Sequence, residues 1–569
     1  MNSPVRKSIG AFYTPEILAD LLSKRMIHIS SKKKIRELNV LDPATGESSL
    51  LKSFVNNIKV RKNIHTNILG IDIDNEALNV SKKMLMGLDN NIKLIHTDAL
   101  YPMGKGHTEG WTDIKSRYLP HGINFIISNP PWGADISKYH NLRSDFEVAK
   151  GQFDIYDLFV DTILDNLIEG GIYGIIVPDS IYNHEHNIVR KKLLNQTVIY
   201  YIYRLGESFF EGVNVSISII IGVKGKAKKN HKVSCFHLNT VNRTKATVDS
   251  YYLDKLSKDK CNRIKQSVMV RSDYSFLLDI DDKDSQLFTH FNDASKHLGD
   301  YVFIDRGVEL SKKGEIVKCP ICGKWMPIPK KNADGSFKCA ICHEKINTNE
   351  RVIETRNIIS KEPSDNSVGL LVGEDINRYK TTVSKYLCLG YKGINYKRQD
   401  IYNSPKILVR KTGVGITAGL DYSDSYSNQV VYIVRLNNNC PDYITIEFIL
   451  AILCSRAMTY FFIKKYGSTE WRSHPYLTQK ILRDLPFPDV SNLHQEIIQE
   501  ITKSVQDICA NHVEGRLDCR IESLVAKIWN LDKTAYKNIF ETIRNVQLMI
   551  PFKRLLNISE EDMQWDIDI

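Results

Sequence analysis

Residues 123–132 read Ile-Asn-Phe-Ile-Ile-Ser-Asn-Pro-Pro-Trp. The first half, Ile123 to Ile127, is a short apolar run that is typical of a buried strand. Pro130 and Pro131 then fix φ and provide no N–H, so the chain leaves the strand along a rigid path. The stretch predicts one strand of a buried sheet with a stiff, polar end.

The four residues that end this strand have side chains and carbonyls suited to a planar amino group. The amide of Asn129 and the carbonyl of Pro130 can both accept hydrogen bonds from one exocyclic NH₂. The ring of Trp132 offers a flat face on which a base can stack. Taken alone, the same residues are also compatible with an Asn-Pro turn that merely ends a strand.

An earlier segment has the pattern of a nucleotide-binding turn. The strand 38–41 runs into Asp42-Pro43-Ala44-Thr45-Gly46 and then a helix, and α/β sheets receive nucleotide-like ligands at such turns. The turn has a single glycine, so the dinucleotide fingerprint is absent, and Asp42 would repel a pyrophosphate. S-adenosylmethionine, which has a sulfonium, an ammonium and no phosphate, fits this turn better.

Two further strands end at acidic residues. The strand 68–71 ends at Asp72, a position from which a carboxylate can hold both ribose hydroxyls, with Asp74 as the alternative. The strand 92–96 is followed by Asp98, which can accept from an adenine amino group. A helix from 156 to 167 and a strand from 172 to 177 continue the alternation, and the fold class is therefore α/β.

A helix is predicted to precede these strands. Thr14 is a favourable N-cap residue and Pro15 suits the first helical position. The apolar side chains of Ile17, Leu18, Leu21 and Leu22 follow at helical spacing.

Together these segments resemble the gamma class of DNA adenine-N6 methyltransferases, especially those of type II restriction–modification systems. Residues 10–15 (Gly-Ala-Phe-Tyr-Thr-Pro) resemble the N-terminal cofactor motif of that class, residues 42–46 its glycine loop, and residues 129–132 its catalytic motif. This order of motifs defines the gamma class. One departure is Ser48, which stands where the family loop usually has a second glycine.

The resemblance implies a Rossmann-like S-adenosylmethionine methyltransferase domain and the roles of its residues. The cofactor-binding residues would be Tyr13, Thr14, Pro15, Asp42, Ala44, Gly46, Asp72, Ile73, Asp98, Ala99 and Asn129. The catalytic residues would be Asn129, Pro130, Pro131, Trp132 and Phe209. Phe209 lies in a segment, 205–209, that resembles the one whose aromatic ring packs on the flipped base, and Phe210 is the alternative.

The reaction that the resemblance implies is methyl transfer to adenine N6. The target adenine must leave the duplex stack at a cost of a few kcal/mol, and stacking on aromatic rings, worth about 1–3 kcal/mol per base, offsets most of it. Methylation at cytosine C5 would need a cysteine nucleophile in a Pro-Cys context, and none of the eleven cysteines has that context beside the site.

The second half of the chain contains a predicted metal site. Cys319 and Cys322 form one Cys-x₂-Cys pair, and Cys339 and Cys342 form another sixteen residues later, a spacing that matches a four-cysteine zinc ribbon. Four thiolates make a closed site, so we expect the Zn²⁺ to be structural. A ribbon that only stabilises the fold is favoured over one that also touches DNA.

Segments around the ribbon resemble parts of the target-recognition domain of these enzymes. They contain the residues that we expect to contact DNA, namely Arg306, Arg378, Arg410 and Lys411. An apolar helix is predicted over 448–463, a loop over 467–475, a closing segment over 482–488 and a helical tail over 493–531.

These predictions give four parts of the chain. Residues 1–245 form the methyltransferase domain, 246–295 a connector, 296–490 a mixed α+β target-recognition domain with the zinc ribbon at 317–345, and 491–569 the helical C-terminal tail.

Composition places the chain among ordinary globular proteins. Hydrophobic residues make up 42% and charged residues 25%, and the net charge of +11 is compatible with a polyanionic partner. No apolar run approaches the roughly 18 residues of a membrane span, and no signal segment is seen, so we expect a cytoplasmic protein. The expected partner is double-stranded DNA, with a separately encoded restriction endonuclease or defence protein as a further partner, and the chain is expected to be a monomer.

Three other functions are compatible with parts of this pattern. An RNA or protein methyltransferase acting on an amino or amide nitrogen would share Asn-Pro-Pro-aromatic but would lack the ribbon-bearing second half. A fused restriction endonuclease–methyltransferase would carry a nuclease domain before the first cofactor motif, where only nine residues precede Gly10. A catalytically inactive DNA-binding subunit is disfavoured by the intact catalytic motif.

Overall fold

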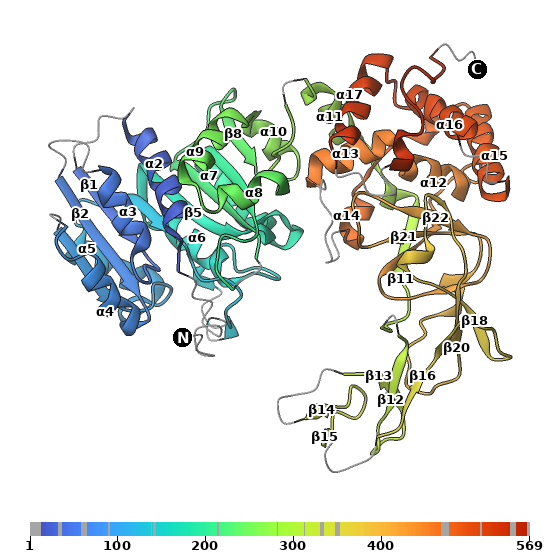
Figure 1. The fold of residues 1–569 in the computed structure, drawn as a ribbon, viewed down its shortest axis with the longest axis horizontal. Coiled ribbons are helices and arrows are strands. Elements are labelled where there is room, and N and C mark those ends of the chain that lie inside the picture. The colour runs from blue at the N-terminus through green and yellow to red at the C-terminus, as the bar shows by residue number, and fades with distance from the viewer. Residues whose placement is uncertain are drawn as a thin grey trace. The chain divides into compact units, whose positions relative to one another are not determined.

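The computed structural model describes most of the chain in two compact units, one ending at Ser285 and the other beginning at Gln286 (Figure 1). The described residues are 13–31, 37–58, 65–88, 91–137, 139, 144–212, 215–281, 283–311, 313–329, 335–347, 353–467, 477–511, 515–546 and 553–565. Residues 10–12 of the N-terminal motif and most of the predicted loop at 467–475 lie outside them.

A nine-stranded sheet forms the centre of the first unit, with strand order β3-β2-β1-β4-β5-β7-β6-β8-β9. Its first five strands run parallel, β7 is antiparallel to both of its neighbours, and β8 and β9 extend the far edge. The strands are β1 (Glu37–Asp42), β2 (His65–Asp72), β3 (Asn91–His96), β4 (Ile123–Ser128), β5 (Leu167–Pro178), β6 (Thr197–Gly206), β7 (Ile217–Lys224), β8 (Lys232–His237) and β9 (Asn262–Lys265).

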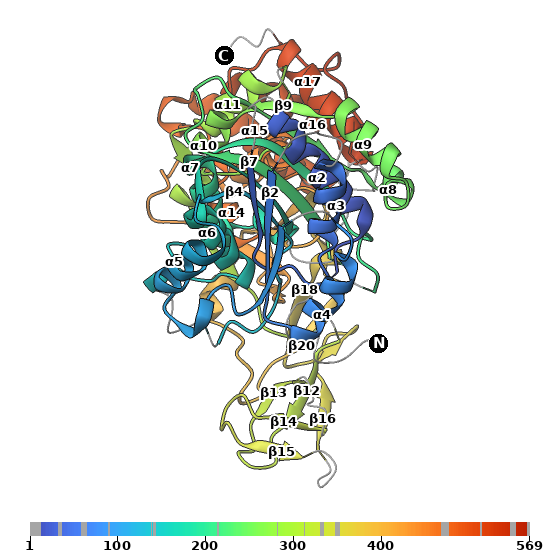
Figure 2. The same cartoon turned by 90° about the vertical axis from the view of Figure 1, so that its left-hand side faces the viewer.

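Helices cover both faces of this sheet, which makes the unit a three-layer α/β fold. Figure 2 shows α2 and α3 on one side of the strands and α5, α6 and α7 on the other. Because both faces are covered, the central strands read as continuous apolar runs rather than as alternating ones. The helices are α2 (Glu16–Ser31), α3 (Ser49–Ile58), α4 (Asn75–Met84), α5 (His107–Tyr118), α6 (Ile155–Asn166), α7 (Asn187–Gln196), α8 (Thr240–Ala246), α9 (Ser250–Asp259) and α10 (Gln266–Arg271).

The predicted connector, 246–295, differs from the structure. Strand β9 pairs with β8 in the main sheet, and α9 packs on α2. Arg25 of α2 is ion-paired with Asp254 of α9 at 2.8 Å. The polar composition that predicts a linker instead belongs to the edge strand β9 and the half-exposed helix α9. The two units divide between residues 285 and 286.

The second unit contains several small sheets below a group of helices. A five-stranded sheet has the order β11-β24-β21-β22-β19, and a four-stranded one has the order β17-β20-β18-β23. These strands are β11 (Val302–Arg306), β17 (Ile359–Ser360), β18 (Ser367–Leu371), β19 (Tyr379–Lys380), β20 (Lys385–Cys388), β21 (Lys406–Arg410), β22 (Ala418–Asp421), β23 (Tyr426–Ser427) and β24 (Val431–Leu436). Two short strands that come before and after these in the chain, β10 (Lys296–His297) and β25 (Pro486–Phe487), pair with each other in antiparallel orientation.

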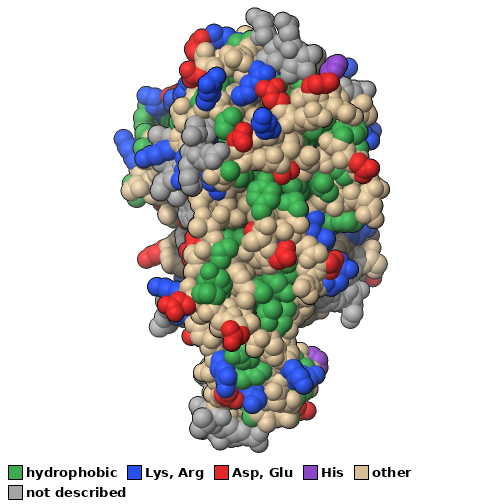
Figure 3. Space-filling view, turned by 90° about the vertical axis from the view of Figure 1, so that its right-hand side faces the viewer, with side chains coloured by type: hydrophobic (Ala, Val, Ile, Leu, Met, Phe, Trp, Pro, Cys, Tyr) green, Lys and Arg blue, Asp and Glu red, His purple; other side chains and the backbone are tan. Residues whose placement is uncertain are grey.

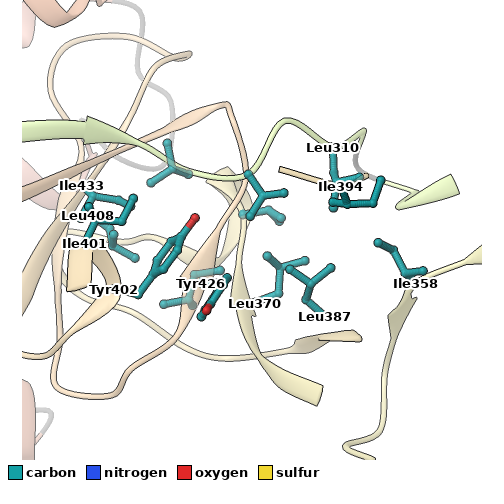
Figure 4. Packing of buried hydrophobic residues seen from close by; sticks show 14 of the residues in the cluster. Leu310, Ile358, Leu370, Leu387, Ile394, Ile401, Tyr402, Leu408, Tyr426 and Ile433 are labelled. Atoms are coloured by element: carbon teal, nitrogen blue, oxygen red, sulfur yellow. The ribbon is translucent and has the colours of Figure 1, made fainter. Parts of the chain in front are cut away.

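One apolar core joins the two larger sheets. Figure 4 shows Leu408 and Ile433 from one sheet packed towards Leu370 and Leu387 from the other, with Tyr402 and Tyr426 between them. The two tyrosine rings are stacked at 3.8 Å between centroids. The core therefore holds the sheets as one body.

The cysteine segment forms the predicted ribbon. It consists of β13-β12-β16 and the hairpin β14–β15, with bounds β12 (Glu315–Lys318), β13 (Trp325–Pro327), β14 (Ser336–Lys338), β15 (Lys345–Asn347) and β16 (Thr355–Asn357).

Helices complete the second unit, and two of them replace the single helix predicted over 448–463. The chain breaks at Ser455, which is extended (φ −67°, ψ 155°) and whose hydroxyl accepts from the N–H of Met458. The helices are α11 (Ser285–Asn292), α12 (Ile446–Cys454), α13 (Arg456–Tyr466), α14 (Gln479–Arg483), α15 (Gln495–Asn511), α16 (Gly515–Ile528) and α17 (Lys533–Arg544). The predicted helical tail corresponds to α15 and α16, and α17 extends it.

Across the described ranges, no single helix is long and apolar enough to cross a membrane. The pair α12 and α13 meets the length and composition criteria together, with a bend of 55° between the two helices.

Candidate functional site

The candidate site lies at the carboxyl edge of the first sheet. β1 lies between β2 and β4, so the chain moves in one direction from β1 to β3 and in the other from β4 to β5. Ligands of open α/β sheets bind outside the strand ends at such a reversal. Asp42 ends β1 and Asn129 follows β4, so the sheet brings these predicted residues to the same edge.

Asp42 is a buried carboxyl group with few hydrogen-bond partners. Its Oδ1 accepts from the N–H of Ala44 at 3.1 Å. Its side chain also interacts with the hydroxyl of Ser128 on the adjacent strand, which is buried as well. Burial raises the pKa of Asp42 to about 8, although the Ala44 N–H opposes this. A cationic group of a ligand would stabilise the charged form of this carboxyl, so the site fits a positively charged ligand.

Asp72 holds the glycine loop. One carboxylate oxygen accepts from the N–H of Gly46 at 2.7 Å and the other from the N–H of Asp74 at 2.8 Å. Burial raises its pKa, and these N–H groups oppose the shift. Asp74 has a different role, because its side chain caps α4 through the N–H groups of Glu76 and Ala77. Asp74 is thus engaged in helix capping, and Asp72 remains the predicted ligand-binding acid.

Ser48 shows how the loop functions without its second glycine. Its φ is +65°, a left-handed conformation that is strained for a residue with a Cβ. The hydroxyl compensates through hydrogen bonds of 2.8 Å with both Thr45 and Ser81, and Ser81 also donates to the Gly46 carbonyl. Tyr13, the described residue of the first motif that precedes Thr14, lies across this loop, with a ring atom 3.9 Å from where a Gly46 Cβ would be.

Asp98 lies at the start of the turn after β3 and is held by two donors. The N–H of Leu100 and the hydroxyl of Tyr139 donate to its two oxygens at 2.9 and 2.8 Å. Ala99 is buried, and its carbonyl accepts from Trp111. Near it, Ile73 and Tyr101 are 49% and 39% exposed, which leaves apolar surface at the place where an adenine ring is expected. Tyr139 and Tyr101 lie in no recognised motif, so the sequence did not predict them.

Asn129 is joined to the N-terminal motif. Its amide nitrogen donates to the hydroxyl of Thr14 at 3.1 Å, so the predicted N-cap residue also orients the catalytic candidate. This bond identifies Oδ1 as the acceptor end of the amide. The turn behind it is fixed by Asp154, which caps α6 and accepts from the N–H of Gly133 at 3.0 Å. Pro130 and Pro131 therefore lie between two anchored residues.

Trp132 and the predicted aromatic segment lie together. The ring of Trp132 contacts that of Phe210 edge-on, with centroids 5.1 Å apart and planes at 89°. Phe209 is also buried, at 6% exposure. The resemblance points to Phe209 as the ring that packs on the flipped base, with Phe210 as the alternative. In the structure the contact with Trp132 is made by Phe210. Only side-chain directions, which the sequence pattern does not give, distinguish the two.

The four predicted metal ligands converge. The Sγ atoms of Cys319, Cys322, Cys339 and Cys342 all lie within 4.8 Å of one another. The Cys319–Cys342 and Cys322–Cys339 sulfur pairs are 3.8 and 4.0 Å apart, which matches the edge of a tetrahedron with metal–sulfur bonds of about 2.3 Å. Backbone N–H groups of Cys322 and Cys342 point at the sulfurs of Cys319 and Cys339. The donor set fits one Zn²⁺.

The four residues expected to contact DNA differ in their exposure and in their partners. Arg306 is exposed at the end of β11, and Lys411 lies near it. The ammonium of Lys411 donates to the Gln429 carbonyl and lies 4.5 Å from the Tyr432 ring centroid. Burial, together with the Arg306 charge, lowers the pKa of Lys411 to about 8. Arg410 is half-buried.

Arg378 is not available for a phosphate contact. It forms an ion pair with the buried Asp518 at 2.7 Å and donates to the Cys454 carbonyl at 3.1 Å. Arg456 shares Asp518 and also pairs with Glu522. The prediction for Arg378 is corrected, because its guanidinium is committed to a network inside the helices.

Two parts of the chain match known protein families. The family N-6 DNA Methylase matches residues 2–291, and the TaqI-like C-terminal specificity domain matches residues 368–487. The DrdV–DNA complex has the same fold over 90% of this chain and 58% of that chain, with a TM-score of 0.51 and 13% identity.

Two curated relatives cover less of the chain. The type II methyltransferase M.BanIII of Aneurinibacillus aneurinilyticus is 31% identical over 239 residues, 38% of this chain and 39% of that protein. The methylase subunit of the type I restriction enzyme MpnII of Mycoplasma pneumoniae is 26% identical over 245 residues, 39% of this chain and 42% of that protein. The chain thus spans about two fifths of the length of these relatives. Because the family match extends over more than half of the chain, the protein belongs to the N-6 DNA methylase family.

Proposed function

We propose that the protein is a sequence-specific DNA methyltransferase that transfers a methyl group from S-adenosylmethionine to adenine N6 in double-stranded DNA, with the target base flipped out of the helix. The observation that carries the proposal is the hydrogen bond between Asn129 and Thr14, which links the catalytic motif to the cofactor motif at the edge that bears Asp42. Similarity to a type II methyltransferase and to a type I methylase subunit supports a role in restriction–modification or phage defence.

S-adenosylmethionine supplies a methyl group activated by a positively charged sulfur. Asp42 would bind its cationic end, Asp72 the ribose hydroxyls and Asp98 the adenine amino group, since these acids lie at successive strand ends. Tyr13, Thr14, Pro15, Ala44, Gly46, Ile73 and Ala99 would line the rest of the pocket.

Asn129 and Pro130 would activate the target amine. The lone pair of adenine N6 is delocalised into the ring, which makes the nitrogen a poor nucleophile. Asn129 Oδ1 and the Pro130 carbonyl would accept its two hydrogens, which favours a pyramidal nitrogen with its lone pair directed at the methyl group. The gain comes from alignment and electrostatics, without a covalent intermediate. The methylated amine then loses its proton to solvent.

The recognition unit supports DNA over the alternative substrates. A methyltransferase for RNA or protein nitrogens would not require a TaqI-like specificity domain, which matches 368–487 here. We propose that Arg306 and Arg410 contribute phosphate or base contacts in this unit and that one Zn²⁺ on Cys319, Cys322, Cys339 and Cys342 stabilises it. Lys411, which is buried and donates to the Gln429 carbonyl, is left out of this set. A separately encoded endonuclease would be the functional partner.

The variant Asn129→Ala tests the catalytic assignment. We expect methyl transfer to fall below detection while cofactor affinity stays within a few-fold, because Asn129 acts mainly on the target amine. Calorimetric titration with S-adenosylmethionine measures the affinity, and Asp72→Ala is the control that should lose it. An equal loss of cofactor binding in both variants would assign Asn129 to the wrong role.

A further inference from the structure

The ribbon region carries a large share of the positive charge of the chain. Residues 312–357 contain ten Lys or Arg and five Asp or Glu, a net charge of +5 out of the +11 of the whole sequence. Four thiolates and one divalent ion, bound as proposed above, would still leave an excess of +3. The segment is therefore basic even with the metal bound.

The ribbon is fixed to the recognition unit by Trp325. Its indole is 8% exposed within the core of that unit and contacts Tyr391 edge-on at 5.4 Å. Its backbone N–H donates to the Lys392 carbonyl at 2.8 Å, and a Cβ on Gly393 would lie 2.4 Å from the Trp325 carbonyl oxygen. The ribbon therefore presents its surface in a defined position on this unit.

Two of the ribbon cations already have structural partners. Lys318 and Arg356 are paired with Glu354 at 3.2 and 3.0 Å, and both lie within 6 Å of the Trp325 ring centroid. The single carboxylate of Glu354 offsets one of these two positive charges.

The remaining lysines have a different environment. Lys313, Lys324 and Lys338 are exposed, and in the part of the chain that the structure describes none of them forms an ion pair. Lys338 and Lys345 are register partners in the hairpin β14–β15. Both lysines therefore lie side by side on this hairpin.

We propose that the ribbon binds the phosphate backbone of the DNA duplex through Lys324 and Lys338, outside the base pairs that are read by the rest of the recognition unit. The proposal rests on DNA being the substrate. Ammonium groups on flexible chains suit phosphate contacts, which position a duplex without reading its sequence. Figure 3 shows basic and apolar side chains side by side on the lower tip of the face that belongs to this unit, and Ile321 and Ile328 are 51% and 47% exposed in the ribbon.

The test compares three double variants of the full chain. Lys324→Ala with Lys338→Ala removes the proposed contacts, and Lys324→Arg with Lys338→Arg retains their charge. Lys255→Ala with Lys260→Ala removes two exposed lysines of the first unit, one in α9 and one directly after it, and is the matched α9 control. The affinity of each variant is measured over a range of salt concentrations for a duplex that contains the sequence methylated by the wild type and for one that lacks it. The thermal midpoint and the zinc content of each variant serve as folding controls.

We expect the ribbon Ala variant to bind both duplexes about tenfold more weakly at moderate salt, with the salt slope reduced by about 1.8, or 0.9 for each lost phosphate contact. The Arg variant and the α9 control should match the wild type, and the methylated sequence should be unchanged. An unchanged slope in the ribbon Ala variant, or an equal loss in the α9 control, would overturn the proposal. If the wild type methylates no DNA, the proposed function fails instead, so the two failures are distinguishable.

Discussion

At the scale of single residues, the site depends on a carboxyl group that is unusual before any ligand binds. Asp42 is wholly buried, and its pKa is raised to about 8. The raised pKa means that the neutral form is favoured in the fold, and the carboxyl becomes less favourable for stability as pH rises from about 4 towards 8. A cationic ligand reverses this preference, since it stabilises the carboxylate.

This coupling predicts proton release on cofactor binding. At pH 7 most Asp42 is protonated, and binding of a sulfonium ligand should release up to one proton. Calorimetric titrations in buffers of different ionisation enthalpy measure the number of protons released. Asp42→Asn is the control, because the variant has no proton to lose at this position. Equal heats for the wild type in all buffers would show that Asp42 does not change its charge on binding.

The positions of several candidate site residues could be predicted from the sequence because these residues lie at the ends of strands. Asp42, Asp72, Asp98 and Asn129 are of this kind. Tyr139, which donates to Asp98, and Phe210, which contacts Trp132, could not be assigned in this way, since their positions depend on how irregular loops fold back on the sheet edge.

At the scale of elements, a buried ion network replaces one predicted DNA contact. Arg378 and Arg456 face Asp518 and Glu522 between the β19 segment and the helices α13 and α16. Burial alone would raise the pKa of Asp518, but the two arginines hold it at about 2. A basic–aromatic segment such as the one around Arg378 looks the same in sequence whether it is exposed or buried. Only its acidic partners Asp518 and Glu522, about 140 residues later, show that it is buried.

Arg378→Ala should therefore act on stability. Removing one partner of a buried ion pair typically costs about 3–5 kcal/mol, because the remaining charge stays buried. We expect a clear fall in the denaturant midpoint of the variant, whereas Arg306→Ala, at an exposed position, should leave it nearly unchanged. Equal midpoints for the two variants would show that Arg378 is not part of the core.

The ribbon gives a second prediction at this scale. The short β14–β15 hairpin and its small apolar cluster, with Phe337 and Ile346, are too small to be stable alone, so we expect the fold of this segment to depend on metal. Elemental analysis should find about one zinc per chain in the wild type and much less in Cys339→Ser, with Cys388→Ser as the control outside the cluster. Unchanged zinc in Cys339→Ser would rule out the four-cysteine site.

At the scale of the whole molecule, the chain combines an α/β unit, whose sheet edge carries the proposed site, with a separate unit whose core is formed by small sheets. The α/β half could be predicted from strand-ending motifs, because parallel strands place consecutive turns at one edge. The second half could be predicted only in outline, since its strands are short and its contacts join residues far apart in sequence, as in the pairing of β11 with β24.

The most direct test of the central claim is base-resolution sequencing of DNA from cells that express the chain, with Asn129→Ala as the matched inactive variant. We expect N6-methyladenine at one defined sequence in the wild type and at none in the variant. Methylation of cytosine, methylation of adenine without a sequence preference, or no modified base in DNA from cells with folded wild-type protein would contradict the account.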